Sequence, residues 1–542
     1  MKLKNIYILT FCAAFALANT TSCTKLKDES YSSILSEDFV PKTDADVAAL
    51  LGRAYTNWRS ILLEWNGLWR AQEVSGDAIV IPARPNGWVD GGIYRRIHEH
   101  KWTTDEDIAI QTWNRTYAGI TNCNRLLYQI ENNLIPFASG KENALAELRV
   151  LRASYYYVLC DIYGNIPLVD KFDLPEGFLP SQSSRKEVYD FIVKEIKDNL
   201  ALLSIKNDQS TYARFNKGAA LTLLAKMYLN AQVYSGTAAW QECIQTCNEI
   251  IALNQYTLEA NQRDVFKTNN ETSKEIIFGI PLDEKYTTNW NAFDIHMQTL
   301  QPENQATYNL KSTPWGGMCA IPQFISSFDA DDSRLKDNWI QGQQYSSSGL
   351  ALNSDMGAFK GKPLAYINEL PGVDSSEAVH GFRLGKFEIK VESTNVLSND
   401  FPLFRYADVL MMKAEALLRT GKPDDAAAIV TELRQRNFRS KPAKATVTGA
   451  QLQAGSSYSY GLRNHFTSTF EGGADIQYGR FLDELGWEFA QEGRRRQDMI
   501  RFGVFTKKSW LSHSPNGDYR SLYPIPRVEI QKNPNLKQNK DY

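Results

Sequence analysis

The chain has 542 residues, of which 43% are hydrophobic and 23% are charged, and its formal net charge is −2. This composition is that of a folded globule, and the balanced charge excludes a surface that attracts nucleic acid through its net field. The aromatic content is high, at 12 Trp, 26 Tyr and 25 Phe. These are more rings than a core needs, so some of them are candidates for ligand contacts.

Residues 1–22 predict a lipoprotein-type signal peptide. Lysines near the start precede an apolar run at residues 6–18, which is too short to cross a bilayer and is typical of an export signal. Cys23 follows, at the place where a bacterial lipoprotein carries its lipid, so we expect Cys23 to be the lipidation site. Cleavage by ordinary signal peptidase after Ala18 is the alternative, and it would leave Cys23 as a free thiol.

Residues 23–42 are polar and form the predicted lipidated tether. The cysteines that follow lie mostly in helical, apolar patterns, where a free cysteine behaves as a small hydrophobe. Cys243 and Cys247 share a helix face, but no nearby histidine or second cysteine pair completes a metal site. We therefore predict buried thiols and no metal at this pair. After Cys23 five cysteines remain, Cys123, Cys160, Cys243, Cys247 and Cys319, and four of them lie in helical, apolar patterns.

Helical periodicity begins after Thr43 and defines residues 43–253 as an N-terminal helical repeat region. Pairs of helices rich in small residues recur, and in the clearest pair Gly421 ends the first helix and Pro423 opens the second. A repeating hairpin of about 34 residues is typical of tetratricopeptide units, which bury their apolar faces by stacking. Unrelated helical pairs in one α-domain are the alternative. The four pairs are 44–60 with 107–131, 141–163 with 185–203, 214–253, and 402–437.

Residues 254–542 form the predicted C-terminal region, which is loop-rich at 254–400 and helical at 401–542. Short β-like runs occur at 275–280 and 383–391. Long irregular loops inside a compact protein are usually functional. The predicted fold class is therefore mainly α: a tetratricopeptide-like helical repeat scaffold with a loop-rich, aromatic-rich portion that contains short β-strands.

Seven sequence blocks, in family order along the chain, resemble the SusD/RagB family of nutrient-binding outer-membrane lipoproteins of Bacteroidetes. One such block would be weak support, whereas seven are specific. The blocks are WNxxYxxIxNxN from Trp113, ExRxxRAxxY from Glu147, YGNIPL from Tyr163, KGAA from Lys217, FRYADVL from Phe404, EGxRxxD from Glu492 and PIP from Pro524.

The resemblance implies a cell-surface protein that binds oligosaccharide or polysaccharide and passes it to a SusC-type TonB-dependent transporter. It also implies a lipid anchor in the outer membrane, with the protein on the extracellular side. Lys27, Asp28 and Glu29 resemble the family's surface-export signal, and a solvated charged tether is the alternative. The alternative function is a peptide- or protein-binding surface lipoprotein of a peptide-import system, because some family members resemble peptide importers.

Residues 84–92 hold the first candidate for glycan contact, Trp88. Asn86-Gly87 is a turn signal, which places the indole on a loop flanked by Arg84, Asn86 and Asp90. Flat rings stack on sugar faces while polar groups bind hydroxyls, and the family carries a glycan-contacting Trp in a similar segment. We therefore predict that Trp88, Arg84, Asn86 and Asp90 contribute to the site; a core-plugging role for Trp88 is the alternative.

Trp315 is the second candidate, because it lies between Pro314 and a Gly-Gly pair and resembles the family's second Trp-bearing loop. Trp290, Phe293 and Tyr308 lie in the same loop-rich region and are predicted to complete an arc of rings. Four other tryptophans fall at or next to helical spacing and are predicted to pack: Trp102, Trp113, Trp240 and Trp487.

Catalysis has little support in the sequence. Glycoside hydrolysis needs two carboxylates across a cleft, whereas the acidic clusters at 105–107 and 483–484 suit a helix start and a scaffold helix. No P-loop, Gly-x-Ser-x-Gly or His-Glu-x-x-His motif occurs. We predict a protein that is not an enzyme and needs no cofactor; the acidic loop at 329–332 leaves structural calcium open.

Overall fold

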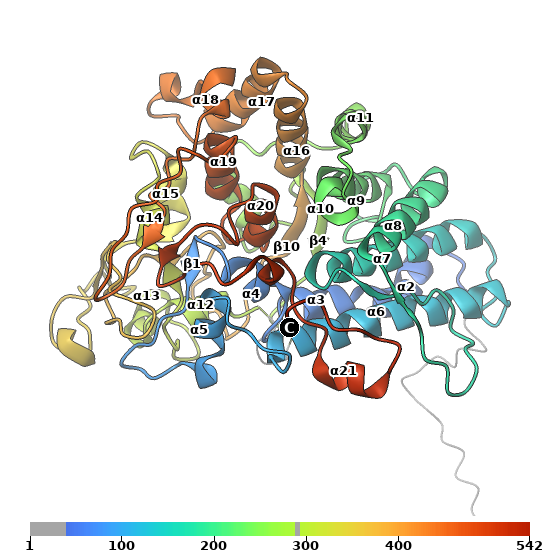
Figure 1. Cartoon of the computed structure of the whole chain (residues 1–542), viewed down its shortest axis with the longest axis horizontal. Coiled ribbons are helices and arrows are strands. Elements are labelled where there is room, and N and C mark those ends of the chain that lie inside the picture. Colours follow the sequence, from blue (N-terminus) through green and yellow to red (C-terminus); the bar gives the residue numbers. More distant parts are fainter. Residues whose placement is uncertain (1–39, 288–292) are drawn as a thin grey trace, which may run out of the picture.

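Helices predominate in the structure, a computed structural model that describes residues 40–287 and 293–542 (Figure 1). The predicted mainly α fold class is confirmed. Cys23 and Trp290 lie outside the described residues. Figure 1 shows the long helices as a frame along the right and top of the molecule, and the loop-rich portion at the lower left.

The predicted helix pairs form one continuous stack. Within it α2 and α3 pack on α6, α6 packs on α7, and the contacts continue through α8, α9, α11 and α16 to α17. This is the arrangement of tetratricopeptide-like repeats, in which each pair covers the apolar face of the next. The helices are α2 (Asp44–Tyr55), α3 (Asn57–Leu62), α6 (Asp107–Glu131), α7 (Lys141–Ile162), α8 (Arg185–Asn199), α9 (Lys217–Leu229), α10 (Ala231–Ser235), α11 (Trp240–Ala252), α16 (Tyr406–Arg419) and α17 (Pro423–Gln435).

Local sequence explains where these helices begin and end. Thr43 and Asp46 form a capping box at the start of α2. Gly421, with φ 77°, follows α16, and Pro423 opens α17, as predicted. On α6, Gly119 lets α7 approach closely, because a Cβ there would lie 2.8 Å from the ring of Tyr155.

The strands are short and form two-stranded sheets within the described residues. The predicted strand at 275–280 is present as β4, whereas the run at 383–391 yields only the two residues of β9. The pairs are β1 (Ile79–Val80) with β5 (Cys319–Ala320), β2 (Ile166–Pro167) with β3 (Gln182–Ser183), β4 (Ile276–Ile280) with β10 (Phe401–Arg405), β6 (Trp339–Ile340) with β9 (Arg383–Leu384), β7 (Gly342–Gln343) with β8 (Ala365–Tyr366), all antiparallel, and β11 (Gly461–Leu462) with β12 (Trp510–Leu511), which is parallel.

Shorter helices connect these sheets to the frame. They are α4 (Leu68–Glu73), α5 (Ile93–His98), α12 (Ile295–Thr299), α13 (Gln305–Tyr308), α14 (Pro322–Ile325), α15 (Ser333–Asp337), α18 (Gly449–Gln453), α19 (Gly479–Phe489), α20 (Arg495–Arg501) and α21 (Arg527–Lys532).

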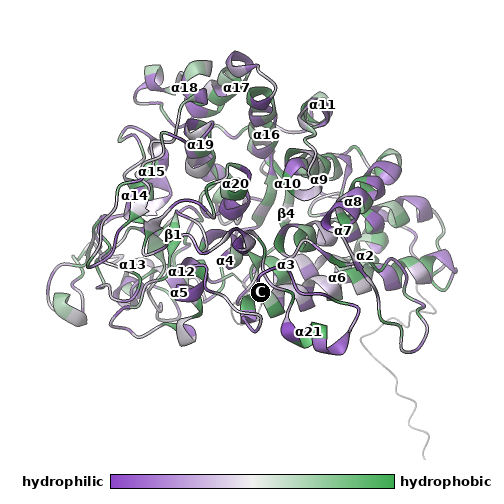
Figure 2. Ribbon diagram, in the orientation of Figure 1, coloured by the Kyte–Doolittle hydropathy of each residue, from purple (hydrophilic) through white to green (hydrophobic). Residues whose placement is uncertain are grey.

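One main hydrophobic core runs through the helical frame and the loop-rich portion. Apolar and polar residues alternate along the frame helices in Figure 2; α6 and α11 bury one side, whereas α7 and α9 are buried nearly all round. The five cysteines of the described residues are free and buried. Of the four tryptophans predicted to pack, Trp240 is half-buried and the others are buried. Within the described residues, every helix is too short or too polar to cross a bilayer.

Candidate functional site

Three tryptophans from distant parts of the chain surround one open cavity of about 220 Å³, here called the aromatic cavity. The ring centroids of Trp88 and Trp315 are 6.2 Å apart with an interplanar angle of 55°. The ring centroid of Tyr94 lies 5.2 Å from that of Trp88, and Trp65 is 45% exposed. The structure thus brings together the two predicted rings and adds Trp65 and Tyr94.

Turns in the backbone hold Trp88 at the cavity. The N–H of Gly87, with φ 80°, donates to the carbonyl of Arg84 at 2.9 Å, which closes the turn that the Asn-Gly pair predicts. Gly317 lies directly against the indole, since a Cβ on that residue would be 2.7 Å from Trp88 Cε3. Trp88 is therefore half-buried, with one side on the backbone of the Trp315 loop.

Arg84 is a structural residue, which corrects the expectation that it contacts ligand. It is 6% exposed, and its guanidinium donates to the carbonyl oxygens of Gly317 at 3.0 Å, His380 at 2.9 Å, and Glu377. Burial, with Arg383 nearby, lowers the pKa of Arg84 to about 9. Because its donors already have backbone acceptors, Arg84 fixes the loops that carry the rings.

The side-chain amide of Asn86 is used in the same way, and Asn86 is outside the lining of the aromatic cavity, so its contact with ligand stays a prediction. Its side-chain amide donates to the carbonyl oxygens of Trp315 and of Gly316, the latter at 3.1 Å. The Trp88 loop is thereby tied to the Trp315 loop.

Asp90 does line the aromatic cavity, and it has an unusual backbone. Its φ is 43°, and Gly91 and Gly92 follow with φ of 62° and 78°, so three consecutive residues lie in the left-handed region. This conformation costs free energy for a residue with a Cβ and is frequent at functional sites. The carboxylate accepts a hydrogen bond from the hydroxyl of Tyr94 at 3.1 Å.

Two polar side chains on the cavity wall, Arg70 of α4 and Gln298 of α12, were not predicted. Arg70 Nη2 lies 3.5 Å from Asp294 Oδ1, and Gln298 donates to the same carboxylate. Arg70 Nε and Gln298 Oε1 are buried without a hydrogen-bond partner among the described residues. Buried polar atoms normally have a partner, so these two atoms are a reason to expect an ordered water or a ligand group at this wall.

Trp65 also escaped prediction, although a signal for it exists. It directly precedes Asn66-Gly67, the same turn dipeptide that precedes Trp88, and the Gly67 N–H closes a turn on the Glu64 carbonyl at 2.8 Å. Arg70 and Gln298 have no comparable signal, because a polar residue in a short helix looks the same whether it faces a cavity or solvent.

Phe293 and Tyr308 are not in the aromatic cavity. Phe293 is 3% exposed and packs edge-on against Phe387 and Phe401, so the expectation of a ligand-contacting ring is corrected to a core role. Tyr308 is half-buried and packs with Trp315 on a small cluster formed by Met297, Leu300 and Leu310.

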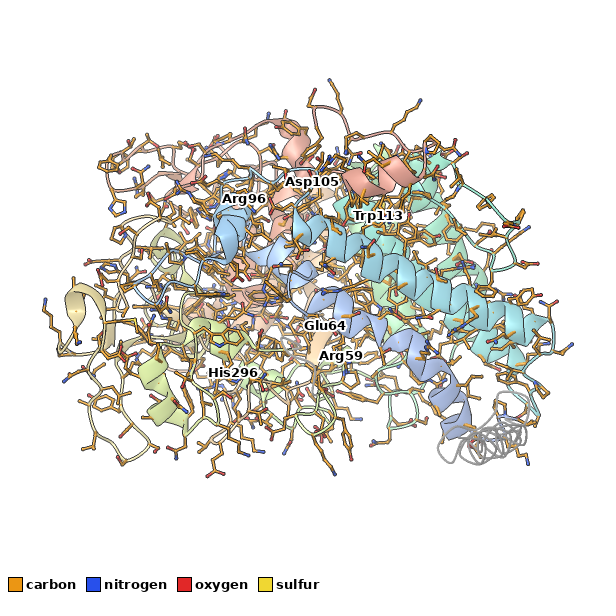
Figure 3. The ribbon with its side chains drawn as sticks, turned by 90° about the horizontal axis from the view of Figure 1, so that it is seen from below. Arg59, Glu64, Arg96, Asp105, Trp113 and His296 are labelled. Carbon is orange, nitrogen blue, oxygen red and sulfur yellow. The ribbon has the colours of Figure 1, made fainter. Side chains whose placement is uncertain are left out.

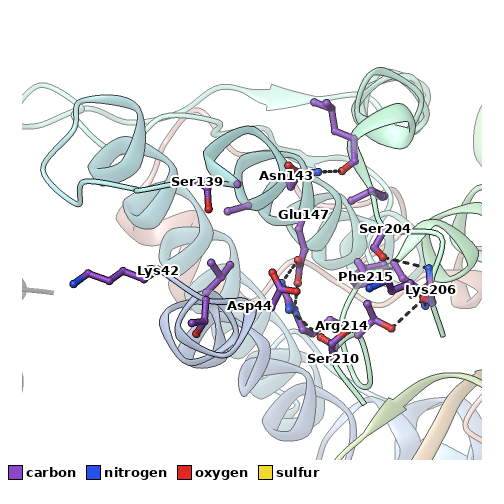
Figure 4. Close-up of a pocket in the computed structure, with 18 residues that line it drawn as sticks. Lys42, Asp44, Ser139, Asn143, Glu147, Ser204, Lys206, Ser210, Arg214 and Phe215 are labelled. Atoms are coloured by element: carbon purple, nitrogen blue, oxygen red, sulfur yellow. Dashed lines mark hydrogen bonds and ion pairs between the residues drawn. The ribbon is translucent and has the colours of Figure 1, made fainter. Parts of the chain in front are cut away.

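A separate pocket of about 380 Å³ lies between the helices of the frame (Figure 4). Glu147 and Arg214 face each other in it, with Oε2 and Nη2 2.6 Å apart, and Lys42 and Asp44 line its edge. Its one aromatic lining residue, Phe215, is 1% exposed. Paired charges without an accessible ring make this pocket a weaker candidate than the aromatic cavity.

The acidic loop considered for calcium uses its carboxylates in ion pairs. Lys444 Nζ lies 2.8 Å from Asp329 and 2.7 Å from Asp331, while Asp332 is paired with Arg334 at 2.6 Å. No group of three metal-binding side chains with suitable placement occurs among the described residues. Calcium binding therefore stays a prediction that this geometry does not favour.

Sequence comparison places most of the chain in known families. A model described as "SusD family" matches residues 274–542, and one described as "Starch-binding associating with outer membrane" matches residues 28–229. Starch-binding protein SusD of Bacteroides thetaiotaomicron is 26% identical over 73% of this chain and 72% of that protein. SusD-like protein P25 of Formosa agariphila is 23% identical over 99% of this chain and 98% of that protein.

Solved structures have the same fold. A SusD superfamily protein from Parabacteroides distasonis matches with a TM-score of 0.70 at 20% identity, over 93% of this chain and 100% of that one. Surface glycan-binding protein A from Bacteroides thetaiotaomicron, solved in complex with laminarihexaose, matches with a TM-score of 0.66 at 18% identity, over 92% and 100%. With both family models, these curated relatives and this fold in agreement, the chain belongs to the SusD/RagB family.

Proposed function

We propose that this protein binds glycan chains in the aromatic cavity and serves polysaccharide uptake. The observation that carries the proposal is the meeting of Trp65, Trp88 and Trp315 around one open cavity. Pyranose rings present apolar C–H faces that stack on indoles, and each Å² of apolar surface removed from water contributes about 25 cal/mol. Arg70, Gln298 and Asp90 supply the hydroxyl partners that orient a sugar.

The relatives support the same reading. One is named a starch-binding protein, and one structural neighbour was solved with laminarihexaose. Because the chain shares the family and fold of these proteins, carbohydrates are the first ligands to test for binding.

Under this proposal the protein binds and releases the sugar without breaking any of its bonds. Hydrolysis of a glycosidic bond uses two carboxylates about 5 to 10 Å apart on either side of the bond. Among the described residues that line the aromatic cavity, Asp90 is the one carboxylate. Asp294 lies behind Arg70 and Gln298, where it accepts their hydrogen bonds.

Location and partner complete the proposal. Cys23 carries the lipid, the protein faces the cell exterior on the outer membrane, and glycan passes to a SusC-type TonB-dependent transporter. The signal-like residues 1–22 and the outer-membrane description of the matching family model support this assignment. Exchange of Cys23 for Ala is expected to abolish labelling of the protein by radioactive palmitate in its host; unchanged labelling would remove the lipid anchor from the proposal.

Glycan and peptide arrays probed with the purified mature protein test the central claim. We expect glycans to bind and peptides not to bind, with the Trp65→Ala variant losing most of the glycan signal. Binding of peptides alone would replace the proposal with the peptide-import alternative, and binding to neither array would overturn it.

A further inference from the structure

A second hollow, of about 470 Å³, is also lined by Trp65; we call it the polar hollow. It shares Trp65 and Asp90 with the aromatic cavity, so the two hollows are neighbours at these residues. Its walls come from α5, from the start of α6 and from the residues between them. Figure 3 shows Arg96 and Asp105 where α5 is followed by α6.

The cations of the polar hollow are already engaged by the protein. Arg96 donates two hydrogen bonds to Glu106, at 2.8 and 2.7 Å, and one to the carbonyl of Gly91 at 2.9 Å. Arg115 donates to the carbonyl of Trp65 at 2.9 Å, which fixes the backbone under that indole. Neither guanidinium is left as an open receptor for an anion.

Acceptors, in contrast, remain available. Asn66 is 2% exposed and lines the polar hollow, and its side-chain oxygen has no donor among the described residues. Its amide donates to Asp107 Oδ2 at 2.7 Å, while Gln111 donates to the other oxygen at 3.1 Å. Asp90 accepts one hydrogen bond, from Tyr94, and has further lone pairs. A ligand rich in hydroxyl donors fits these acceptors.

We propose that one glycan chain crosses Trp65 and occupies both the aromatic cavity and the polar hollow, and that Asp90, at their junction, selects chains free of carboxylate and sulphate groups. This inference rests on the proposed function, because it assumes that the aromatic cavity binds glycan. It adds a second part to the site and a chemical class of ligand.

Charge explains the selection. Among the described residues, four acidic and two basic side chains line the polar hollow, and both basic ones are engaged. Glu106 is paired with Arg96 and Asp105 with Arg527, which leaves the charges of Asp90 and Asp107 without an ion pair of their own in the described part of the chain. In the aromatic cavity, Arg70 is paired with Asp294. An anionic substituent near Asp90 meets a like charge at short range, where the Coulomb repulsion weakens binding by about tenfold or more. Neutral hydroxyls meet acceptors instead.

An array of neutral, carboxylated and sulphated glycans is the first experiment. We expect the strongest signals from neutral chains, and stronger signals from anionic chains would overturn the selection by Asp90. An array without any binding would overturn the proposed function itself, so the two failures are distinguishable.

Asp90→Asn tests the residue directly, since Asn tolerates positive φ and keeps the shape. The probes are the strongest neutral oligosaccharide from the array and the same compound oxidised at C6 to carboxylates, both titrated by calorimetry. We expect the wild type to bind the oxidised form about tenfold more weakly than the neutral one, and Asp90→Asn to narrow that ratio by about threefold or more. Asp475→Asn, at a surface carboxylate paired with Lys508, should leave the ratio unchanged. An unchanged ratio in Asp90→Asn would contradict the inference.

Chain length tests the polar hollow. Gln111→Ala removes one polar side chain from its wall, and we expect it to weaken a hexasaccharide about threefold while leaving a trisaccharide unaffected. Equal affinities of wild type and variant for both lengths would confine the ligand to the aromatic cavity.

Discussion

The side-chain amide of Asn86 donates hydrogen bonds to the backbone oxygens of Trp315 and Gly316, so the loop that carries Trp88 holds the loop that carries Trp315. The two indoles therefore have a common support, and their separation of 6.2 Å is fixed by a residue that does not itself line the cavity. Ordering the rings before binding reduces the entropy that a ligand must remove.

Asn86→Ala is expected to weaken glycan binding several-fold without removing any ring. The loss of its hydrogen bonds costs about 1 kcal/mol of folding free energy, but it frees Trp315 from Trp88. Asn535→Ala is the matched control, because Asn535 also joins two loops, by a bond to the Leu179 carbonyl. Calorimetric titration and thermal melts of both variants decide the matter. Equal affinity in Asn86→Ala and the wild type would show that the tie has no role in binding.

Removal of a ring is the more direct test of the aromatic cavity. Trp65→Ala, Trp88→Ala and Trp315→Ala are each expected to lower affinity by about tenfold or more, since a buried aromatic contact contributes on the order of 1–3 kcal/mol. Trp240→Ala controls for the loss of a half-buried indole. Trp240 is on α11, where it packs under the guanidinium of Arg419, and it does not line the cavity. Losses of the same size in Trp240→Ala would mean that the effect is general destabilisation.

Gly317→Ala offers a way to displace Trp88 without deleting it. The added Cβ would lie 2.7 Å from the indole, closer than any real contact, so the ring has to move. We expect reduced affinity and altered fluorescence of the tryptophans. Gly349→Ala has a positive φ of 83° but open space around it, and it should change stability alone. Wild-type affinity in Gly317→Ala would show that the position of Trp88 is not critical.

Sequence patterns predicted the helical frame well because its signals are local. Small residues at close-packing positions and the Gly421–Pro423 turn determine the hairpins without reference to distant parts of the chain. The Asn-Gly turn before Trp88 is local in the same sense. The same Asn-Gly dipeptide follows Trp65, and it indicates a turn next to that indole as well.

Burial and hydrogen-bond use could not be predicted in this way. The guanidinium of Arg84 donates to the carbonyl oxygens of Gly317, Glu377 and His380. These residues are far from Arg84 in the sequence, and no local pattern indicates them. Phe293 is covered by Phe387 and Phe401, which also come from elsewhere in the chain. Whether a ring in a loop contacts ligand or core depends on such long-range partners.

The buried ion network around Glu488 is expected to control stability. Its carboxylate lies 2.7 Å from Arg436, 2.9 Å from Arg405 and 3.1 Å from Arg334, and it is fully buried. Burial alone would raise its pKa, but these guanidinium groups hold the pKa of Glu488 well below its usual range.

Glu488→Gln leaves these cations without their shared counter-charge, so we expect a loss of about 3–5 kcal/mol in the free energy of unfolding. Glu529→Gln, at a surface pair with Lys532, should change it by less than about 0.5 kcal/mol. Denaturant unfolding measures both. A small effect in Glu488→Gln would show that the network relaxes around the lost charge.

A cluster of buried histidines predicts acid sensitivity. The rings of His100 and His513 have centroids 4.0 Å apart, and His98 is equally buried nearby. Burial lowers the pKa of His98 to about 4 and that of His100 to about 3. Burial and the adjacent His100 also lower the pKa of His513.

Acid removes the stability that these neutral histidines provide. Between pH 6.5 and about 4 the unfolded chain protonates these histidines while the folded chain keeps them neutral, so their stabilisation is complete above pH 6.5 and falls as the pH is lowered. Each such group contributes up to about 1.4 kcal/mol per pH unit to this slope. Glu73 acts in the opposite direction, because burial raises its pKa to about 7 and the folded state takes up a proton below that value.

Two variants therefore separate the opposing contributions. His100→Phe, which keeps an aromatic ring stacked 4.1 Å from Phe505, should make the unfolding free energy less dependent on pH between 6.5 and 4. Glu73→Gln should make it fall more steeply as the pH is lowered from 7 to 4.5. Urea unfolding at a series of pH values gives both slopes. If the free energy of unfolding depends on pH in the same way in His100→Phe and the wild type, His100 takes up its proton in the folded protein. Its ring would then have to separate from Phe505 and His513 at low pH.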